Sequence, residues 1–374
     1  MDVLLKRYLK AVVHLFVHLK RGLWIFIVIL SLVSLAWVAQ QYVNEVTVRS
    51  ACLSSNSYVA VKSPQSVTRA AVERTRTDRR RLFVRIPGSS ARLGNRMFAH
   101  AALLGLAADT GLQATIAFSD DRDILNSIFN LTTCRVTEVR RAHMRMIQGP
   151  WRTAVYVPPP KNLTAGAFED DDFVLIGYFQ SWRYFQGADE RVRAEFRFRK
   201  HVADAATRVL SQLTAQYRKA SNNLVLVGIH VRRSDMALDY HLRRGYTVAD
   251  EHYIRRAMNY VADRVTTQAN GTATSLLFIV CSDDIGWARL NIRNTSYPVV
   301  FASSLTRKAE VDLAVLASCD HVITTVGTFS WWAGYLHRPD GITVYYAGFP
   351  KSGTEIGNDF HAEDFFPPGW IGLL

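Results

Sequence analysis

The sequence contains few cysteines and lacks several signatures of other protein classes. Its 374 residues include only four cysteines, whose wide spacing excludes a small disulfide scaffold and shows no metal-ligand pattern: Cys52, Cys134, Cys281 and Cys319. No internal repeat, low-complexity tract or nucleic-acid-binding motif is present, so the net charge of +13 does not indicate nucleic-acid binding. The length allows one large or two ordinary domains.

Much of the positive charge lies near the N-terminus, on both sides of an apolar segment. Residues 22–39 contain no charged residue, are long enough to cross a bilayer as a helix, and carry Trp24 and Trp37 near their ends. Residues 1–21 are rich in lysine and arginine, which predicts a cytoplasmic tail and a luminal or extracellular C-terminal part. A cleaved signal peptide is the alternative.

Residues 40–81 show no sustained hydrophobic period, which predicts a stem between the membrane and a globular domain. Sequons on the predicted luminal side make four asparagines candidate N-glycosylation sites: Asn130, Asn162, Asn270 and Asn294. Cys52 in the stem is the candidate for an intermolecular bond and hence for a homodimer. Cys281 and Cys319 fall in apolar segments, where they are expected to be buried thiols.

After residue 81, apolar runs of strand length alternate with helical patterns. Strands are expected within residues 82–86, 115–118, 173–179, 224–235, 275–281, 321–325 and 343–346. Helices are expected within 95–109, 201–217, 248–267, 308–318 and after 326. A strand, a glycine-containing turn and a helix indicate Rossmann-like units, although the GxGxxG fingerprint is absent. Residues 219–223 are expected to be the boundary between two halves.

The stretch Leu224–Asp235 (LVLVGIHVRRSD) is a buried strand that ends in charged residues. His230 and Arg232 share one face of this strand. Arg232 and Arg233 suit an anionic ligand, because guanidinium groups bind phosphate oxygens in a bidentate way. Alternatively, this is a solvated strand end at which Asp235 merely pairs with an arginine.

Loops that follow other strands carry groups suited to a sugar or a phosphate. Gly94 permits close backbone approach, and Asn95 begins the helix that follows it. Thr328 and Ser330 lie at the start of another helix, where they can assist backbone donors in holding a phosphate or can simply cap the helix. The aromatic and polar side chains of residues 178–185 suit a sugar, although they can equally belong to the core.

Acidic residues at strand ends have competing uses. Asp121 and Asp123 resemble a metal-binding pair, but acidic runs are also common in surface loops. Asp283 can accept hydrogen bonds from guanine or can cap a helix, whereas Asp284 is expected to be a cap. The run at residues 169–172 precedes its strand, so we expect a solvated turn there.

Four segments resemble motifs of the GDP-fucose-using galactoside α1,2-fucosyltransferases, glycosyltransferase family 11. Val227–Asp235 is similar to the HxRRxD signature and Arg92–Met97 to the RLGNQM segment. Gly177–Phe185 resembles the GYFQS segment, and Thr325–Ala333 resembles TxGTFxxWA. The matches follow the family's order and span most of the chain after residue 81.

The resemblance implies a GT-B-like fold of two Rossmann-like halves, preceded by a single transmembrane helix and the stem. Residues 82–222 would form the acceptor-side half and residues 223–374 the GDP-fucose-binding half. It implies inverting fucose transfer to a galactose-terminated glycan without a required metal or cofactor, by a single-pass type II Golgi enzyme. Arg96 replaces the family's usual Gln and Ser234 a common Gly, which could alter acceptor preference or local geometry.

The resemblance also implies roles for individual residues. The expected catalytic residues are His230, Arg232 and Asp235. The donor-binding set contains His230, Arg232, Arg233, Asp283, Thr328, Ser330, Gly94 and Asn95. Arg232 is expected to contact the diphosphate and Asp283 to bind guanine. Asp235 would act as general base or would orient an arginine.

Two other functions fit parts of the sequence. A metal-dependent glycosyltransferase of another specificity would use Asp121 and Asp123. A catalytically silent glycan-binding membrane protein would keep the fold without turnover.

Overall fold

The computed structural model describes residues 80–86, 92–117, 123–136, 144–150, 154–160, 163, 172–269, 273–293 and 295–374. All of them belong to one compact unit, Val72–Leu374. The predicted tail, the membrane span and nearly all of the stem lie outside the described residues. Among the helices that are described, none combines the length and apolarity that a membrane span requires.

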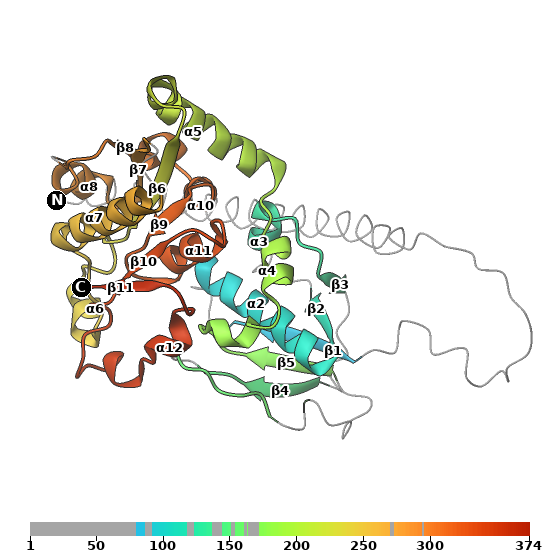
Figure 1. The fold of residues 1–374 in the computed structure, drawn as a ribbon. Coiled ribbons are helices and arrows are strands. Elements are labelled where there is room, and N and C mark those ends of the chain that lie inside the picture. The colour runs from blue at the N-terminus through green and yellow to red at the C-terminus, as the bar shows by residue number, and fades with distance from the viewer. Residues whose placement is uncertain are drawn as a thin grey trace, which may run out of the picture. The chain divides into compact units, whose positions relative to one another are not determined.

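The first sheet has five parallel strands in the order β3-β2-β1-β5-β4 (Figure 1). Its strands are β1 (Arg81–Arg85), β2 (Gln113–Ala117), β3 (Cys134–Val136), β4 (Met144–Gln148) and β5 (Asp172–Ile176). Helix α2 (Leu93–Thr110) follows β1 and packs against it, and it ends at Gly111, whose φ of 70° is the left-handed conformation that favours glycine. The remaining helices of this part are α3 (Asp123–Ile128), η4 (Trp182–Phe185), α4 (Asp189–Glu195) and α5 (Lys200–Ala220).

Asp172 anchors the start of β5, contrary to the expectation of a solvated turn. The residue is buried, and its carboxylate accepts hydrogen bonds from the backbone amide of Arg81 at 3.0 Å and from the Arg81 guanidinium. The adjacent strands therefore begin with a partly buried ion pair. For Asp172, the prediction of a solvated turn was wrong because the partner lies on a strand distant in sequence.

The second sheet has six parallel strands in the order β8-β7-β6-β9-β10-β11. They are β6 (Leu224–Val231), β7 (Ser275–Ser282), β8 (Val299–Phe301), β9 (His321–Ile323), β10 (Thr343–Tyr346) and β11 (Ile371–Leu373). The chain enters this sheet at the central strand β6 and continues through β7 to β8 at one edge. It then returns to β9, beside β6, and continues through β10 to β11 at the other edge, as in doubly wound nucleotide-binding folds. The two parallel sheets confirm the predicted α/β class.

Helices cover both faces of the second sheet. Val227, Ile229 and Val231 pack on one face against α7 (Glu251–Gln268). The opposite face packs against α10 (Ala309–Ala317) and α11 (Thr328–Leu336). Shorter helices connect the strands: α6 (Asp239–Arg244), α8 (Ile285–Asn291), α9 (Ser303–Thr306), η5 (Gly357–Asp359) and α12 (Ala362–Phe365).

One hydrophobic core contains residues of both sheets. Trp331 and Trp332 of α11 are buried against Phe98 of α2, with ring centroids 4.5 and 5.2 Å apart. The indole N–H of Trp332 donates to the carbonyl oxygen of Gly94 at 3.0 Å. Helix α11 of the second sheet is therefore fixed directly to the helix that follows β1.

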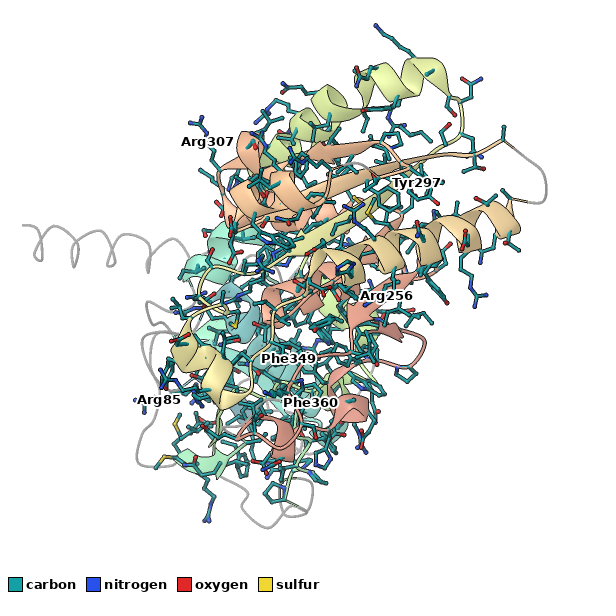
Figure 2. The ribbon with its side chains drawn as sticks, turned by 90° about the vertical axis from the view of Figure 1, so that its left-hand side faces the viewer. Arg85, Arg256, Tyr297, Arg307, Phe349 and Phe360 are labelled. Atoms are coloured by element: carbon teal, nitrogen blue, oxygen red, sulfur yellow. The ribbon has the colours of Figure 1, made fainter. Side chains whose placement is uncertain are left out.

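The segment between β10 and β11 packs back on the molecule, as the aromatic composition of the tail predicts. Figure 2 shows Phe349 and Phe360 from this segment close together, with ring centroids 5.5 Å apart. Phe349 is buried in a small cluster with Met236 and Val326. Since Met236 follows Asp235 directly, this segment supports the residues at the end of β6.

Two glycine substitutions test the packing of α2. A Cβ added to Gly105 would lie 2.1 Å from the carbonyl oxygen of Tyr184, whereas one added to Gly286 of α8 would only approach a side-chain oxygen at 3.6 Å. We expect Gly105→Ala to lower the free energy of unfolding by more than about 2 kcal/mol, because backbone must move. Gly286→Ala is the matched control and should leave the free energy of unfolding unchanged or raise it slightly. Urea denaturation measures both, and equal stability of the two variants would contradict this packing.

Candidate active site

The four motif segments follow two central pairs of neighbouring strands. At each pair, the connections of the chain change direction and lead to opposite edges of the sheet. The HVRRSD segment leaves β6 and the VGTFS segment leaves β9, and these are neighbouring strands in the second sheet. The RLGN segment follows β1 and the GYFQ segment follows β5, which are neighbours in the first sheet. In open parallel sheets, ligands bind beyond the carboxyl ends of such strand pairs. The topology therefore brings the motifs to the positions where ligand binding is expected.

Arg232 is held at the end of β6 by contacts with the neighbouring motif. Its backbone amide donates to Thr325 Oγ1 at 3.0 Å. Its guanidinium lies so close to Gly327 that a Cβ there would be 3.0 Å from Nη1. Gly327 has a φ of 89°, so both its conformation and its neighbour favour glycine. The side chain of Arg232 is thus fixed beside the start of α11.

Asp235 binds two arginines from different motifs. Its carboxylate accepts a hydrogen bond from Arg232 Nη2 at 2.9 Å and forms an ion pair with Arg92 Nη1 at 2.9 Å. Partial burial opposes ionisation, but the bond from Arg232 and the positive charges of Arg232 and Arg92 hold the pKa of Asp235 below its ordinary value. A carboxylate with a lowered pKa and two bound guanidinium groups is a weak base. This geometry favours the orienting role over the general-base role.

His230 is a neutral hydrogen-bonding residue in this structure. It is 6% exposed, and its Nδ1 lies 2.9 Å from Ser330 Oγ. Burial, with a smaller contribution from the charge of Arg232, lowers the pKa of His230 to about 3. Because Ser330 Oγ accepts from the Thr325 amide at 2.9 Å, its own proton is available to donate to Nδ1. The hydroxyl of Ser330 therefore joins β6 to α11.

Ser330 was expected to hold a phosphate, but its side chain is fully buried. The burial results from its place on the inner side of α11, where His230 and the Thr325 amide surround the hydroxyl. Direct contact between this hydroxyl and a phosphate does not fit the structure. We assign Ser330 instead to positioning His230.

The side chain of Arg233 contacts α8 and the residue before the cap of α7. Its guanidinium stacks 3.9 Å from the centre of the Trp287 ring and donates to the carbonyl oxygen of Ala249 at 2.8 Å. Its backbone amide donates to Asp283 Oδ1 at 2.9 Å. Arg233 therefore organises the loop next to Asp283. Trp287 was not anticipated from the sequence, because its contact with Arg233 arises only in the folded structure.

Asp283 is exposed immediately after β7. One carboxylate oxygen binds the Arg233 amide, and its carbonyl oxygen accepts from the Ser234 hydroxyl at 3.1 Å. The serine that replaces the family's common glycine thus adds a bond between these loops. The next residue, Asp284, accepts from the Trp287 amide at 3.0 Å, which confirms it as the cap of α8.

Gly94 and Asn95 meet the start of α11. A Cβ added to Gly94 would lie 2.6 Å from Thr328 Oγ1 and 2.8 Å from the Phe329 amide nitrogen, so no larger residue fits. Asn95 Oδ1 accepts from Thr328 Oγ1 at 2.8 Å and from Gln180 Nε2 at 3.0 Å. Thr328 is therefore bound to the first-sheet motifs, and Gln180 belongs to the segment 178–185, whose polar side chains were expected to suit a sugar.

Asp121 and Asp123 are the candidate metal pair. Asp121 and the Asp123 side chain lie outside the described residues. Within the described ranges, no group of three or more His, Cys, Asp or Glu side chains could hold a metal ion.

The expected modification sites are only partly described. Asn130 is exposed, whereas Asn162, Asn270 and Asn294 lie outside the described residues. In the Asn130 sequon, the Thr132 amide donates to buried Glu195 at 2.9 Å, and the Thr132 hydroxyl also binds that carboxylate.

Other expectations for individual side chains are confirmed. Cys281 and Cys319 are buried free thiols. Tyr184 and Phe185 belong to the core, which was one of the two interpretations of the aromatic segment. Arg96 is also buried.

Taken together, the motif contacts place Arg232, an exposed Asp283 and the first turn of α11 at the carboxyl edge of one parallel sheet. This arrangement suits the binding of the phosphate groups of a nucleotide. The family model described as "Glycosyl transferase family 11" matches residues 58–374. The chain belongs to this family. The earlier resemblance is thereby confirmed.

Relatives within family 11 support the same assignment. Galactoside alpha-(1,2)-fucosyltransferase 1 of Sus scrofa is 31% identical over 292 residues, covering 75% of this chain and 73% of the relative. The human protein of that name is also 31% identical, over 288 residues, covering 76% and 73%. Galactoside 2-alpha-L-fucosyltransferase SEC1 of Bos taurus is 30% identical over 293 residues, covering 76% and 72%.

Solved structures add little to this comparison. Fucosyltransferase NodZ from Bradyrhizobium has a TM-score of 0.41 and 14% identity, covering 69% of this chain and 94% of NodZ.

The lowered pKa of His230 predicts an acid-dependent loss of stability. The folded protein holds this imidazole neutral below its ordinary pKa of 6.5, whereas the unfolded chain binds a proton there. The contribution of this neutral imidazole to the free energy of unfolding is therefore fully present above pH 6.5. It is lost as pH falls, by up to about 1.4 kcal/mol per pH unit. We expect His230→Asn to give a shallower fall in the free energy of unfolding between pH 7 and pH 5. The exposed His252→Asn is the control, and identical slopes for wild type and His230→Asn would contradict the assignment.

Proposed function

We propose that the protein transfers L-fucose from GDP-β-L-fucose to a hydroxyl of a terminal β-galactoside, inverting the anomeric centre and forming an α1,2 linkage. The observation that carries this proposal is the convergence of the four family 11 motifs around Arg232 and the start of α11. The names of the relatives supply the sugar and the linkage. The protein is thus proposed to be a galactoside 2-α-L-fucosyltransferase.

Arg232 stabilises the departing diphosphate in this proposal. The oxygen of the acceptor hydroxyl forms its bond to the fucosyl carbon as the bond from that carbon to the diphosphate oxygen breaks, and the hydroxyl proton passes to water. GDP leaves with the electron pair, so negative charge grows on the phosphate oxygens. A guanidinium held beside the first turn of α11 can stabilise that charge without moving. Thr328 and its Asn95 partner keep this turn in place.

Guanine binding is assigned to Asp283. One of its carboxylate oxygens binds the Arg233 amide, and the residue is exposed. A carboxylate oxygen can accept from the N1–H and the 2-amino group of guanine. Arg233 supports Asp283 through its stacking on Trp287.

We propose that no metal or other cofactor is required, because arginines and helix amides supply the positive potential at the diphosphate. Transfer should therefore continue in a metal chelator. Complete loss of transfer in the chelator, with recovery on adding a divalent cation, would instead support the metal-dependent alternative.

We also propose a single-pass type II protein of the Golgi membrane with a luminal catalytic part. The support is the uncharged segment at residues 22–39, the basic residues before it and the sequons after it. Cys52 would link two copies in a homodimer. A protease-protection assay on sealed Golgi vesicles tests the topology, and the migration of a Cys52→Ser variant under non-reducing conditions tests the dimer.

Substitution of Arg232 tests the central assignment. We expect Arg232→Lys to lower kcat/KM for GDP-fucose by about 100-fold, because lysine cannot replace a bidentate guanidinium. Arg289→Lys is the matched control and should retain normal turnover, since Arg289 lies on exposed α8 and donates to Ser304. The assay measures fucose transfer to a panel of galactosides, followed by linkage analysis. Near-normal turnover by Arg232→Lys would refute the assignment. Donor binding without transfer by the wild type would favour a silent binding protein.

Asp235→Asn separates the two roles of that carboxylate. If Asp235 orients Arg232 and Arg92, the variant should show a severalfold higher KM for GDP-fucose and a fall in kcat of less than about tenfold. A general base would give a larger fall in kcat, about 100-fold or more. The measurement is steady-state kinetics from pH 5 to pH 8.

A further inference from the structure

Gln180 and Asn95 form a pair of amides with unused hydrogen-bonding groups. Asn95 Oδ1 accepts from both Gln180 Nε2 and Thr328 Oγ1. These two bonds fix the orientation of both amides. They leave Gln180 Oε1 as an acceptor and Asn95 Nδ2 as a donor, and neither atom has a hydrogen-bond partner among the described residues.

The free oxygen of Gln180 is unusual for a side chain that is only 6% exposed. Buried polar atoms are normally paired, because an unpaired one loses its hydration without compensation. In the described part of the chain, the side-chain atoms that are both fully buried and unpaired are the Nδ1 atoms of His241 and His337. Gln180 Oε1 is not among them, so this oxygen still reaches the surface of the protein.

The residue before Gln180 is held in a strained conformation. Phe179 has a φ of 51°, in the left-handed region that bulky residues avoid. Its ring lies against Gly149, where a Cβ would come within 2.3 Å of the ring carbons, and it is buried. Strain of this kind is concentrated at functional sites. Here it sets the direction in which Gln180 leaves β5.

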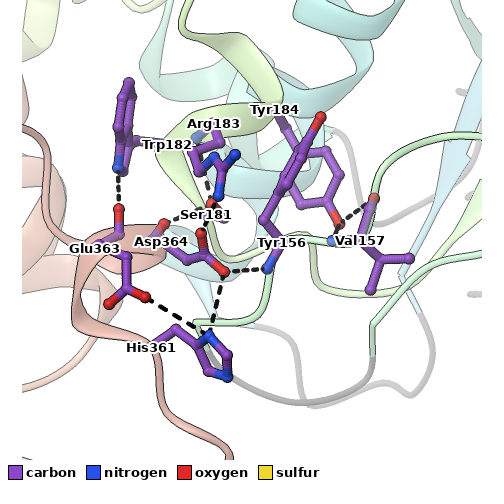
Figure 3. A network of polar contacts seen from close by, with 9 residues as sticks. All are labelled: Tyr156, Val157, Ser181, Trp182, Arg183, Tyr184, His361, Glu363 and Asp364. Atoms are coloured by element: carbon purple, nitrogen blue, oxygen red, sulfur yellow. Dashed lines mark hydrogen bonds and ion pairs between the residues drawn. The ribbon is translucent and has the colours of Figure 1, made fainter.

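The residues after Gln180 are anchored to the segment around α12 (Figure 3). The Ser181 hydroxyl donates to the carbonyl oxygen of Asp364, and the indole N–H of Trp182 donates to that of Glu363 at 2.9 Å. Arg183 donates to the buried Asp364 carboxylate at 2.7 Å. Gln180 is therefore held from both sides, as expected of a group that must meet a ligand in one geometry.

The location of Gln180 indicates which ligand it meets. Through Asn95 it is bound to Thr328, which directly follows the glycine that Arg232 contacts. Yet Gln180 leaves the first sheet, whereas Arg232 and Asp283 belong to the second. It therefore lies near the expected diphosphate position but on the side opposite the nucleotide-binding residues.

We propose that Gln180 is an acceptor-binding residue, whose Oε1 accepts a hydrogen bond from a hydroxyl of the galactoside that does not react. Asn95 Nδ2 donates to an oxygen of the same sugar. An amide acceptor beside an amide donor matches a sugar hydroxyl pair, since each hydroxyl can donate and accept. This inference rests on the proposed function, and it assigns Asn95 to the acceptor as well as to the support of Thr328.

Substrate analogues combined with substitution test the proposal. The wild type and Gln180→Ala are assayed with a galactoside and with its 3-deoxy, 4-deoxy and 6-deoxy analogues. We expect one analogue to lower kcat/KM of the wild type by about tenfold, the effect of one lost hydrogen bond. The same analogue should lower kcat/KM of Gln180→Ala by less than about twofold, because the amide oxygen that binds the missing hydroxyl is already absent from this variant. If each analogue lowered kcat/KM by the same factor in the wild type and in Gln180→Ala, the proposal would be overturned.

Controls separate this inference from a structural role and from the proposed function. Gln186→Ala, on an exposed residue just after η4, should behave as the wild type with every analogue. Gln180→Ala should raise the KM for the galactoside while the Kd for GDP changes by less than about twofold. If Gln180→Ala lowers Tm, the similarly shaped Gln180→Met replaces it. Absence of transfer by the wild type to any galactoside refutes both proposals, whereas transfer without analogue coupling refutes only this one.

Discussion

The contact of Gly94 with the first turn of α11 is the constraint on which the candidate site depends. A side chain at this position would overlap Thr328 and the backbone of Phe329. Only because the backbone comes this close can Asn95 reach Thr328 and Arg92 reach Asp235. The same approach lets Trp332 bind the Gly94 carbonyl oxygen and carry the contact into the shared core. A steric requirement at one residue thus connects packing with the placement of charge.

The charges of the site are arranged in advance of ligand binding. Asp235 holds the guanidinium groups of Arg232 and Arg92, while His230 is kept neutral by burial. Two cations and one anion leave a net positive potential beside the start of α11, which suits a diphosphate. Such fixed groups stabilise developing charge more effectively than side chains that must reorganise during the reaction.

Local sequence was sufficient for the long strands and for the residues at their ends. β5, β6 and β7 were anticipated because their apolar runs are fully or mostly buried, and Asp284 because its capping is a local interaction. The three-residue strands β3, β8 and β11 have no such pattern, and β4 is largely exposed. Pairings such as Gln180 with Asn95 depend on strand order, which no local pattern encodes. The burial of Ser330 likewise follows from how α11 packs.

The Asn130 sequon also places a constraint on the order of events during biosynthesis. In the folded chain, the amide and hydroxyl of Thr132 are bound to Glu195, a carboxylate that is almost completely buried. An enzyme that must engage this threonine to modify Asn130 competes with that bond once the first sheet has formed. A glycan on Asn130 would therefore have to be attached while the segment around β3 is still unfolded. A glycan at this asparagine would thus show that the segment around β3 folds more slowly than the glycan is attached.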